Sequence, residues 1–159
     1  HSGTAAQRHS GTAAQRHSGT AAQRSLHGGR NMARLGADLL DRTKMFSHRM
    51  LDVAEVVAEN KSNPWMTNRI VHQIVGCGTS VGANTREADE AMTRKDFCHC
   101  LSIVLKELSE SRFWLELVTE RGWIPSSRLS ELVHESRELS SIFSVMVARS
   151  RAKPTRPKR

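Results

Sequence analysis

The sequence has few aromatic residues and few prolines: four Phe, three Trp, no Tyr and four Pro among 159 residues. Long stretches rich in Leu, Val, Glu, Arg and Ser are typical of helical proteins. No apolar run reaches the roughly 18 residues of a membrane-spanning helix, and no apolar segment of a signal peptide precedes the candidate helices. We therefore expect an all-α protein without a membrane partner.

Cysteine is also scarce, and the odd number of three argues against a disulfide framework and favours a cytoplasmic location. Cys98, His99 and Cys100, with Cys77 and His72, are the candidate zinc ligands. Adjacent helical positions diverge by about 100°, so Cys98 and Cys100 point to opposite sides of a helix. We expect buried or half-exposed thiols, no metal site and no cofactor.

The net charge of +8 is distributed unevenly along the chain. Residues 1–37 hold five arginines and no acid, and residues 152–159 hold four basic residues and no acid. Residues 38–151 hold 15 basic and 16 acidic residues and are nearly neutral. The basic character therefore belongs to the two ends, and the central region makes a weak case for an obligate nucleic-acid-binding surface.

The first 24 residues are three perfect copies of the octapeptide His-Ser-Gly-Thr-Ala-Ala-Gln-Arg. A unit this short and polar cannot bury an apolar face, so we expect no structural repeat. Met32 is a plausible natural start, and residues 1–31 are expected to be dispensable. We predict disordered tails at residues 1–37 and 152–159.

Between these tails, apolar residues recur at helical spacing in four segments. The third segment carries an unbroken heptad seam, and the first and fourth segments alternate steps of three and four. In chain order, the core-facing sets are Leu39, Thr43, Phe46, Met50, Val53 and Val57; Ile70, Ile74, Cys77, Val81 and Ala88; Phe97, Leu101, Val104, Leu108, Ser111, Leu115 and Val118; and Leu129, Leu132, Ser136, Leu139, Phe143 and Met146.

Helix start and stop signals separate these segments. Asn63-Pro64 resembles an N-cap followed by proline at the first helical position. Thr93 and Asp96 form a capping-box pattern, and Gly122 is suited to the position after a helix end. Four amphipathic helices with short loops predict an antiparallel, up-down-up-down four-helix bundle over residues 38–151.

Three glycines, Gly76, Gly78 and Gly82, lie inside the second predicted helix. Each costs a helix roughly 1 kcal/mol relative to Ala, and close approach of another backbone is the usual reason to keep them. Their spacing does not match a phosphate-binding loop, and no strand precedes them. We predict that Gly78 and Gly82 let helices approach each other.

Ser80, Asn84 and Glu87 share one face of the same helix, at positions i, i+4 and i+7. On one interpretation Ser80 and Asn84 hydrogen-bond between close-packed helices and Glu87 pairs with a basic residue. On the other, the three form a polar strip for a ligand or partner. We favour the first and include all three in the helix-packing motif.

These segments resemble a known family. The residues that carry the resemblance are Leu39-Leu40-Asp41-Arg42-Thr43-Lys44, His72-Gln73-Ile74-Val75, Gly78-Thr79-Ser80-Val81-Gly82-Ala83-Asn84, Arg86-Glu87-Ala88, Phe97, Ile103-Val104-Leu105-Lys106-Glu107 and Phe113-Trp114-Leu115-Glu116-Leu117. Over about residues 38–151 the chain resembles the bacterial four-helix-bundle proteins first noticed as reading frames inside 23S rRNA intervening sequences. Cys77, where a basic or polar residue is expected, and the repeat-bearing N-terminus depart from the pattern.

The resemblance implies antiparallel four-helix bundles that assemble into rings, commonly pentamers. A related branch, the accessory protein of diversity-generating retroelements, partners a reverse transcriptase and binds nucleic acid through basic faces. A reverse transcriptase is therefore an expected partner if this chain is encoded by a retroelement. No catalytic residues are established for the family, so none is assigned here.

Two surfaces follow as candidate sites. Phe113, Trp114 and Leu117 cannot all face a single core together with the heptad seam, so we expect them between subunits of a homo-oligomer. The C-terminal cations could neutralise phosphates of RNA or DNA, or could serve as a solubilising end. They are Arg149, Arg151, Lys153, Arg156, Lys158 and Arg159.

We thus expect a non-enzymatic, ring-forming, homo-oligomeric scaffold or adaptor with a capacity for nucleic acid. One alternative is a purely structural oligomeric module that binds no nucleic acid. A second is a helical ribonuclease of the HEPN class, which uses an arginine followed four to six residues later by a histidine. Three pairs fit that loose spacing: Arg42 and His48, Arg94 and His99, and Arg128 and His134.

Overall fold

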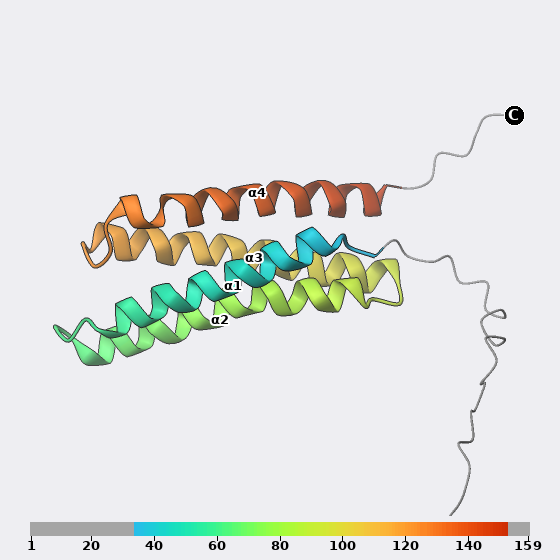
Figure 1. The fold of residues 1–159 in the computed structure, drawn as a ribbon. Coiled ribbons are helices and arrows are strands. Elements are labelled where there is room, and N and C mark those ends of the chain that lie inside the picture. The colour runs from blue at the N-terminus through green and yellow to red at the C-terminus, as the bar shows by residue number, and fades with distance from the viewer. Residues whose placement is uncertain (1–33, 153–159) are drawn as a thin grey trace, which may run out of the picture. The chain divides into compact units, whose positions relative to one another are not determined.

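The computed structural model describes residues 34–152, which form four α-helices joined by short loops (Figure 1). The helices are α1 (Ala37–Ala58), α2 (Pro64–Asp89), α3 (Arg94–Glu120) and α4 (Ser126–Arg151). Successive helices run antiparallel, and the described part of the chain contains no strand, so the predicted four-helix bundle is confirmed. Most of the two predicted tails, residues 1–33 and 153–159, lies outside the described residues.

The predicted boundary signals lie at the ends of the helices. Thr93 Oγ1 accepts a hydrogen bond from the Asp96 backbone N–H at 3.1 Å and caps α3. Gly122 follows α3 with φ 69°, and its N–H bonds to the Thr119 carbonyl at 2.9 Å. The Trp123 N–H bonds to the Val118 carbonyl at 3.0 Å, which completes a Schellman motif. The chain can therefore reverse sharply between α3 and α4.

The core lies along the predicted seams. All seven seam residues of α3 are buried, and five of the six predicted on α1 are buried, with Leu39 only partly so. At the end of α4 the prediction is off by one position: Val147 is buried and Met146 is half-buried. A step of four residues from Phe143 stays closer to the core-facing side here than a step of three.

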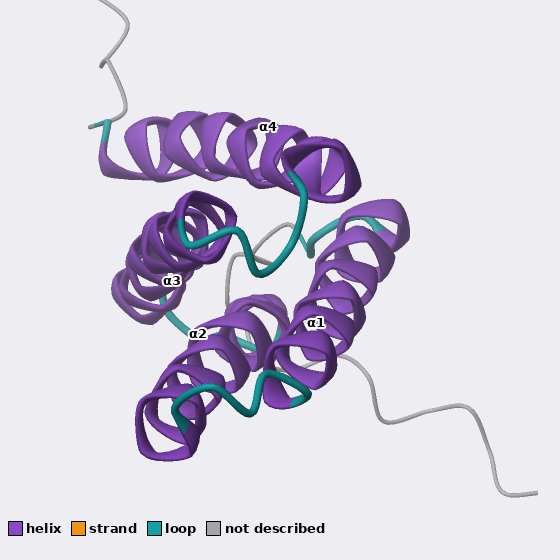
Figure 2. Ribbon diagram, turned by 90° about the vertical axis from the view of Figure 1, so that its left-hand side faces the viewer, coloured by secondary structure: helices purple, strands orange, loops and turns teal. Residues whose placement is uncertain are grey.

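The helices pack in chain order, α1 on α2, α2 on α3 and α3 on α4 (Figure 2). The fourth edge, between α1 and α4, has the fewest contacts. No helix in the described part of the chain is long and apolar enough to cross a membrane. Because α1 and α4 pack less closely than the other neighbouring helices, polar side chains and a groove lie between them.

Candidate assembly and nucleic-acid interfaces

The glycine motif lies where α2 meets α1. A Cβ atom added to Gly78 would overlap the Cβ of Met50, and one added to Gly82 would lie 2.7 Å from Ser47 Oγ. Ser47 Oγ donates a hydrogen bond to the Gly78 carbonyl at 2.8 Å, which links the two helices directly. By contrast, no atom lies within 4 Å of a Cβ added to Gly76. Two of the three glycines therefore have a packing reason within one subunit, and Gly76 has none there.

The polar residues of the motif do not make the bonds expected of them. The Asn84 side-chain amide donates to the Ser80 carbonyl at 2.9 Å, within α2 itself. Glu87 is exposed and makes no ion pair within residues 34–152. The polar link between helices comes instead from Ser47 on α1. A single small residue at the edge of an apolar stripe gives too weak a sequence signal to identify this donor.

The predicted interface residues lie on the outside of α3. Phe113 is 54% exposed, whereas Trp114 and Leu117 are half-buried. The Phe113 and Trp114 rings make an edge-to-face contact with centroids 4.9 Å apart. Trp114 Nε1 also donates to Glu110 Oε1 at 3.1 Å, which fixes the indole at the surface. Trp114 thus packs against the edge of the core and holds the exposed Phe113 ring at the surface.

The cationic C-terminus is only partly described. Arg149 and Arg151 lie exposed in the last turn of α4, where their charges complement the helix dipole. Arg151 Nη2 donates to Ser102 Oγ on α3 at 3.2 Å. The other candidates, Lys153, Arg156, Lys158 and Arg159, lie outside the described residues.

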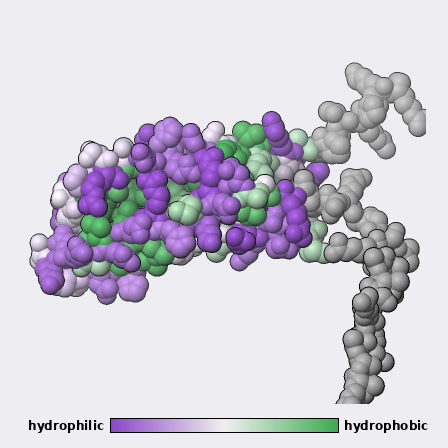
Figure 3. Space-filling view, viewed as in Figure 1, coloured by the Kyte–Doolittle hydropathy of each residue, from purple (hydrophilic) through white to green (hydrophobic). Residues whose placement is uncertain are grey.

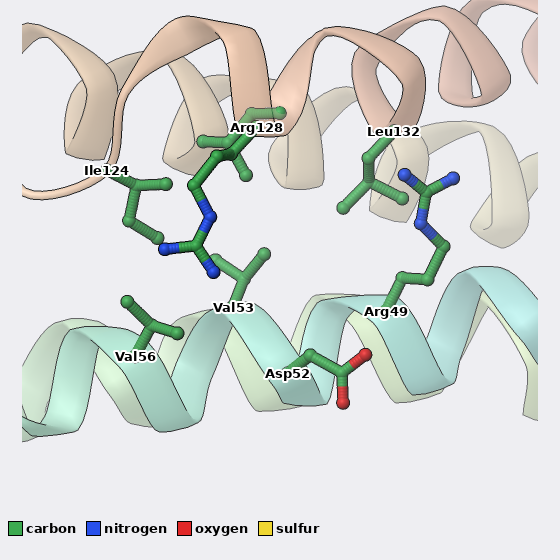
Figure 4. Close-up of a pocket in the computed structure, with 8 residues that line it drawn as sticks. Arg49, Asp52, Val53, Val56, Ile124, Arg128 and Leu132 are labelled. Carbon is green, nitrogen blue, oxygen red and sulfur yellow. The ribbon is translucent and has the colours of Figure 1, made fainter.

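A shallow groove of about 140 Å³ lies at the edge between α1 and α4 (Figure 4). Arg49 extends into it from α1 and Arg128 from α4, above an apolar floor, and Asp52 lies beside them. The floor consists of Val53, Val56, Ile124, Leu129 and Leu132. Apolar surface is visible between the polar side chains at this end of the bundle (Figure 3). The sequence pointed to Arg128 only as part of a ribonuclease pair with His134, and it did not point to Arg49, although Arg42 and Arg49 lie seven residues apart on one face of α1.

The structure places the three arginine–histidine pairs with ribonuclease spacing on three different helices, α1, α3 and α4. Arg42 is held by Glu135 and Glu138 of α4, and the hydrogen bond to Glu135 raises the pKa of its guanidinium. His134 Nδ1 lies 3.8 Å from a Glu138 oxygen. Arg94 and His99 are both exposed on α3, and five residues along a helix turn their side chains to different sides.

A family model described as 23S rRNA-intervening sequence protein matches residues 45–144, from the third turn of α1 into α4. The chain belongs to this family. A crystal structure from Bacteroides thetaiotaomicron, described as a protein with unknown function from the S23 ribosomal protein family, is similar at 29% identity and a TM-score of 0.62. The similarity covers 70% of this chain and 96% of that chain. No curated protein matches this chain.

Cys77, which departs from the residue type expected in the family, is part of the core. Burial raises the pKa of its thiol to about 11, and the neighbouring Ser111 hydroxyl offsets only part of that effect. Ser111 Oγ is buried and has no oxygen or nitrogen partner for a hydrogen bond within residues 34–152. Its neighbour is the Cys77 sulfur, which forms only weak hydrogen bonds. Cys98 is buried and Cys100 half-buried. Within the described residues, no group of three or more His, Cys, Asp or Glu side chains is placed to hold a metal ion.

Proposed function

We propose that this protein is a non-enzymatic, homo-oligomeric scaffold or adaptor that forms a ring and binds nucleic acid. The observation that carries the proposal is the aromatic pair Phe113 and Trp114, which packs edge to face on the outside of α3. Phe113 is the exposed member of this pair, and a large aromatic side chain held in place at the surface by a neighbouring ring is typical of residues that anchor a protein interface.

Burial of the exposed Phe113 side chain between subunits supports the proposed self-association. A Phe or Trp side chain carries about 150–250 Å² of surface, and burial of apolar surface contributes about 25 cal/mol per Å². Covering the exposed half of Phe113 alone therefore contributes about 2 kcal/mol per contact. In a ring each subunit makes two such contacts, because one surface of each copy meets a different surface of the next and the circle closes.

Assembly also supports binding of RNA or DNA. A single C-terminus with Arg149 and Arg151 neutralises few phosphates, so one subunit alone binds weakly. A ring brings several copies of these cations to one nucleic acid and raises the overall affinity through effective concentration. The contacts are to phosphates, so binding is salt-dependent and largely independent of sequence. A reverse transcriptase is a further partner if the gene lies in a retroelement.

The test of assembly is light scattering of the full chain and two glutamate variants. Phe113→Glu introduces a charge into the proposed interface, and Met92→Glu is the control because Met92 is 90% exposed at the turn between α2 and α3. We expect an oligomer for the wild type and for Met92→Glu, and dissociation for Phe113→Glu with unchanged helical circular dichroism. A monomeric wild type at micromolar concentration in moderate salt would contradict the proposal.

The test of nucleic-acid binding separates the scaffold from a purely structural module. Fluorescence anisotropy of a labelled single-stranded RNA is measured from low to moderate salt with the full chain and with a chain that lacks residues 152–159. We expect binding that weakens with salt and weakens further on truncation. Absence of binding by the full chain at low salt would support the purely structural alternative.

A further inference from the structure

A groove between α1 and α2 is lined by three basic side chains and by no carboxylate. Lys44 and His48 come from successive turns of α1, and Arg86 comes from α2. The groove has a volume of about 280 Å³, and its other lining residues are Ser47, Leu51, Thr79, Gly82 and Ala83. Gly82 has no side chain where α1 approaches, so the floor lies close to the backbones of both helices.

The three basic residues have no acidic partners within residues 34–152, where every ion pair involves other side chains. On the other side of α1, Arg42 is fully engaged by glutamates of α4. One turn beyond Arg86, the Asp89 carboxylate accepts a hydrogen bond from the Leu35 backbone N–H at 2.7 Å. The positive charge of the groove is therefore not neutralised by facing carboxylates.

Two other grooves of the bundle differ in this respect. The groove between α1 and α4 includes Asp52 beside its arginines. The groove between α3 and α4, with a volume of about 580 Å³, includes Glu116 and Glu120 beside its two arginines. Carboxylates repel phosphate, so the α1–α2 groove is better suited to an anion than either of these.

We propose that the α1–α2 groove binds the phosphodiester backbone of nucleic acid, with Lys44, His48 and Arg86 donating to phosphate oxygens. This site rests on the nucleic-acid binding proposed above and places it on the folded body as well as on the C-terminus. The hydroxyls in the groove are already committed, since Ser47 donates to the Gly78 carbonyl and Thr79 to the Val75 carbonyl. These hydroxyl hydrogens are therefore not available to phosphate, and the groove contacts it through the charged and ring N–H groups of Lys44, His48 and Arg86.

The first test compares two charge-matched double variants of the full chain. Lys44→Gln/Arg86→Gln removes two cations from the groove, and Lys61→Gln/Lys95→Gln removes two exposed cations elsewhere. We expect the groove variant to bind single-stranded RNA about tenfold more weakly at low salt and to lower the salt slope by about 1 to 2. The control should change the affinity by less than about threefold.

The second test changes the charge of the groove without changing its shape. Ala83 is exposed on the groove wall, so Ala83→Glu and Ala83→Gln place side chains of equal size there and differ only in charge. We expect Ala83→Glu to bind RNA at least about tenfold more weakly than Ala83→Gln. Unchanged thermal unfolding of both variants shows that neither effect arises from misfolding.

The outcomes distinguish this inference from the broader proposal. If the full chain binds no RNA at low salt, both fail. If it binds RNA and truncation of residues 152–159 abolishes binding while the groove variants bind like wild type, only the groove inference fails. A third arm titrates inorganic phosphate and follows the His48 ring by NMR. A groove that takes phosphate while its variants keep wild-type RNA affinity is a small-anion site, and that result also overturns the inference.

Discussion

Arg42 of α1 and Glu135 of α4 form a bidentate ion pair across the α1–α4 edge, which is the least closely packed edge of the bundle. Arg42 Nε lies 2.9 Å from Glu135 Oε1, and Nη2 lies 2.8 Å from Oε2. Glu138, one turn further along α4, accepts a third bond from Nη2 at 2.8 Å. The pair is partly buried, so it is screened less than a surface ion pair. It is the strongest polar link between the first and last helices.

Replacement of Arg42 should loosen this edge. Arg42→Met retains an apolar chain in place of the arginine methylene groups but removes the three charge-assisted hydrogen bonds of the guanidinium. Glu135 and Glu138 are then left to repel each other. We expect a loss of about 1 to 2 kcal/mol in the free energy of unfolding, measured by urea at fixed protein concentration. Arg49→Met is the control, because its 3.8 Å pair with the well exposed Glu131 should contribute less than about 0.5 kcal/mol. Equal losses for the two variants would show that the bidentate pair adds nothing.

The glycines of α2 should respond to alanine in opposite directions. At Gly78 the new methyl group overlaps Met50, and the overpacking cost of about 1 to 3 kcal/mol exceeds the helix-propensity gain of about 1 kcal/mol. At Gly76 the methyl group meets no atom of residues 34–152 beyond its neighbours in α2, so only the gain of about 1 kcal/mol remains. Chemical unfolding of Gly78→Ala and Gly76→Ala measures both effects. A stabilised Gly78→Ala would contradict the close approach of α1 and α2.

Cys77 should make stability depend on pH in the alkaline range. The folded-state pKa of its thiol is raised from 9.0 to about 11, so the unfolded chain loses the proton first as the pH rises. The difference in unfolding free energy between the wild type and Cys77→Ala therefore stays constant near pH 7 and shifts against the wild type between about pH 9 and 11, by on the order of 1 kcal/mol at pH 10. Urea unfolding at pH 7, 9 and 10 measures this difference. Gly76→Ala changes no titrating group, so its free energy of unfolding should depend on pH in the same way as that of the wild type.

Two buried serines in core-facing positions form a matched pair. Ser111 Oγ has no normal hydrogen-bond partner, whereas Ser136 Oγ donates to the Val133 carbonyl at 2.8 Å. Ser111→Ala removes an unsatisfied hydroxyl and should stabilise the fold by about 0.5 to 1 kcal/mol, whereas Ser136→Ala should be neutral or slightly destabilising. Thermal unfolding compares the two. A destabilised Ser111→Ala would mean that the contact with Cys77 is a real hydrogen bond.

Local signals account for the parts of the structure that the sequence predicts well. Apolar spacing determines which face of each helix is buried, and Thr93 and Gly122 mark helix ends because their chemistry satisfies terminal backbone groups. The exposure of Phe113 also follows from spacing, since one side of α3 already fills the seam. These features depend on residues within a few positions of one another.

Features that join distant helices were not predictable in the same way. Arg42 and Glu135 are 93 residues apart, and nothing local identifies the partner of either side chain. The glycine spacing indicates a close approach, but not that Met50 and Ser47 are the residues approached. Arg86 likewise appears as one more surface cation until α1 places Lys44 and His48 across the groove from it. Apolar periodicity predicts that the helices exist and which face of each is buried. It does not predict which side chains of different helices lie next to each other.

The proposed function requires a multi-subunit assembly that binds nucleic acid. Light scattering after size exclusion, with and without a labelled single-stranded RNA at low salt, measures the mass of the assembly and the RNA bound to it. We expect a species of about five times the 17.7 kDa chain mass that takes up RNA and releases it as salt rises. A monomer of 17.7 kDa that carries no RNA at any salt concentration would contradict the proposed function.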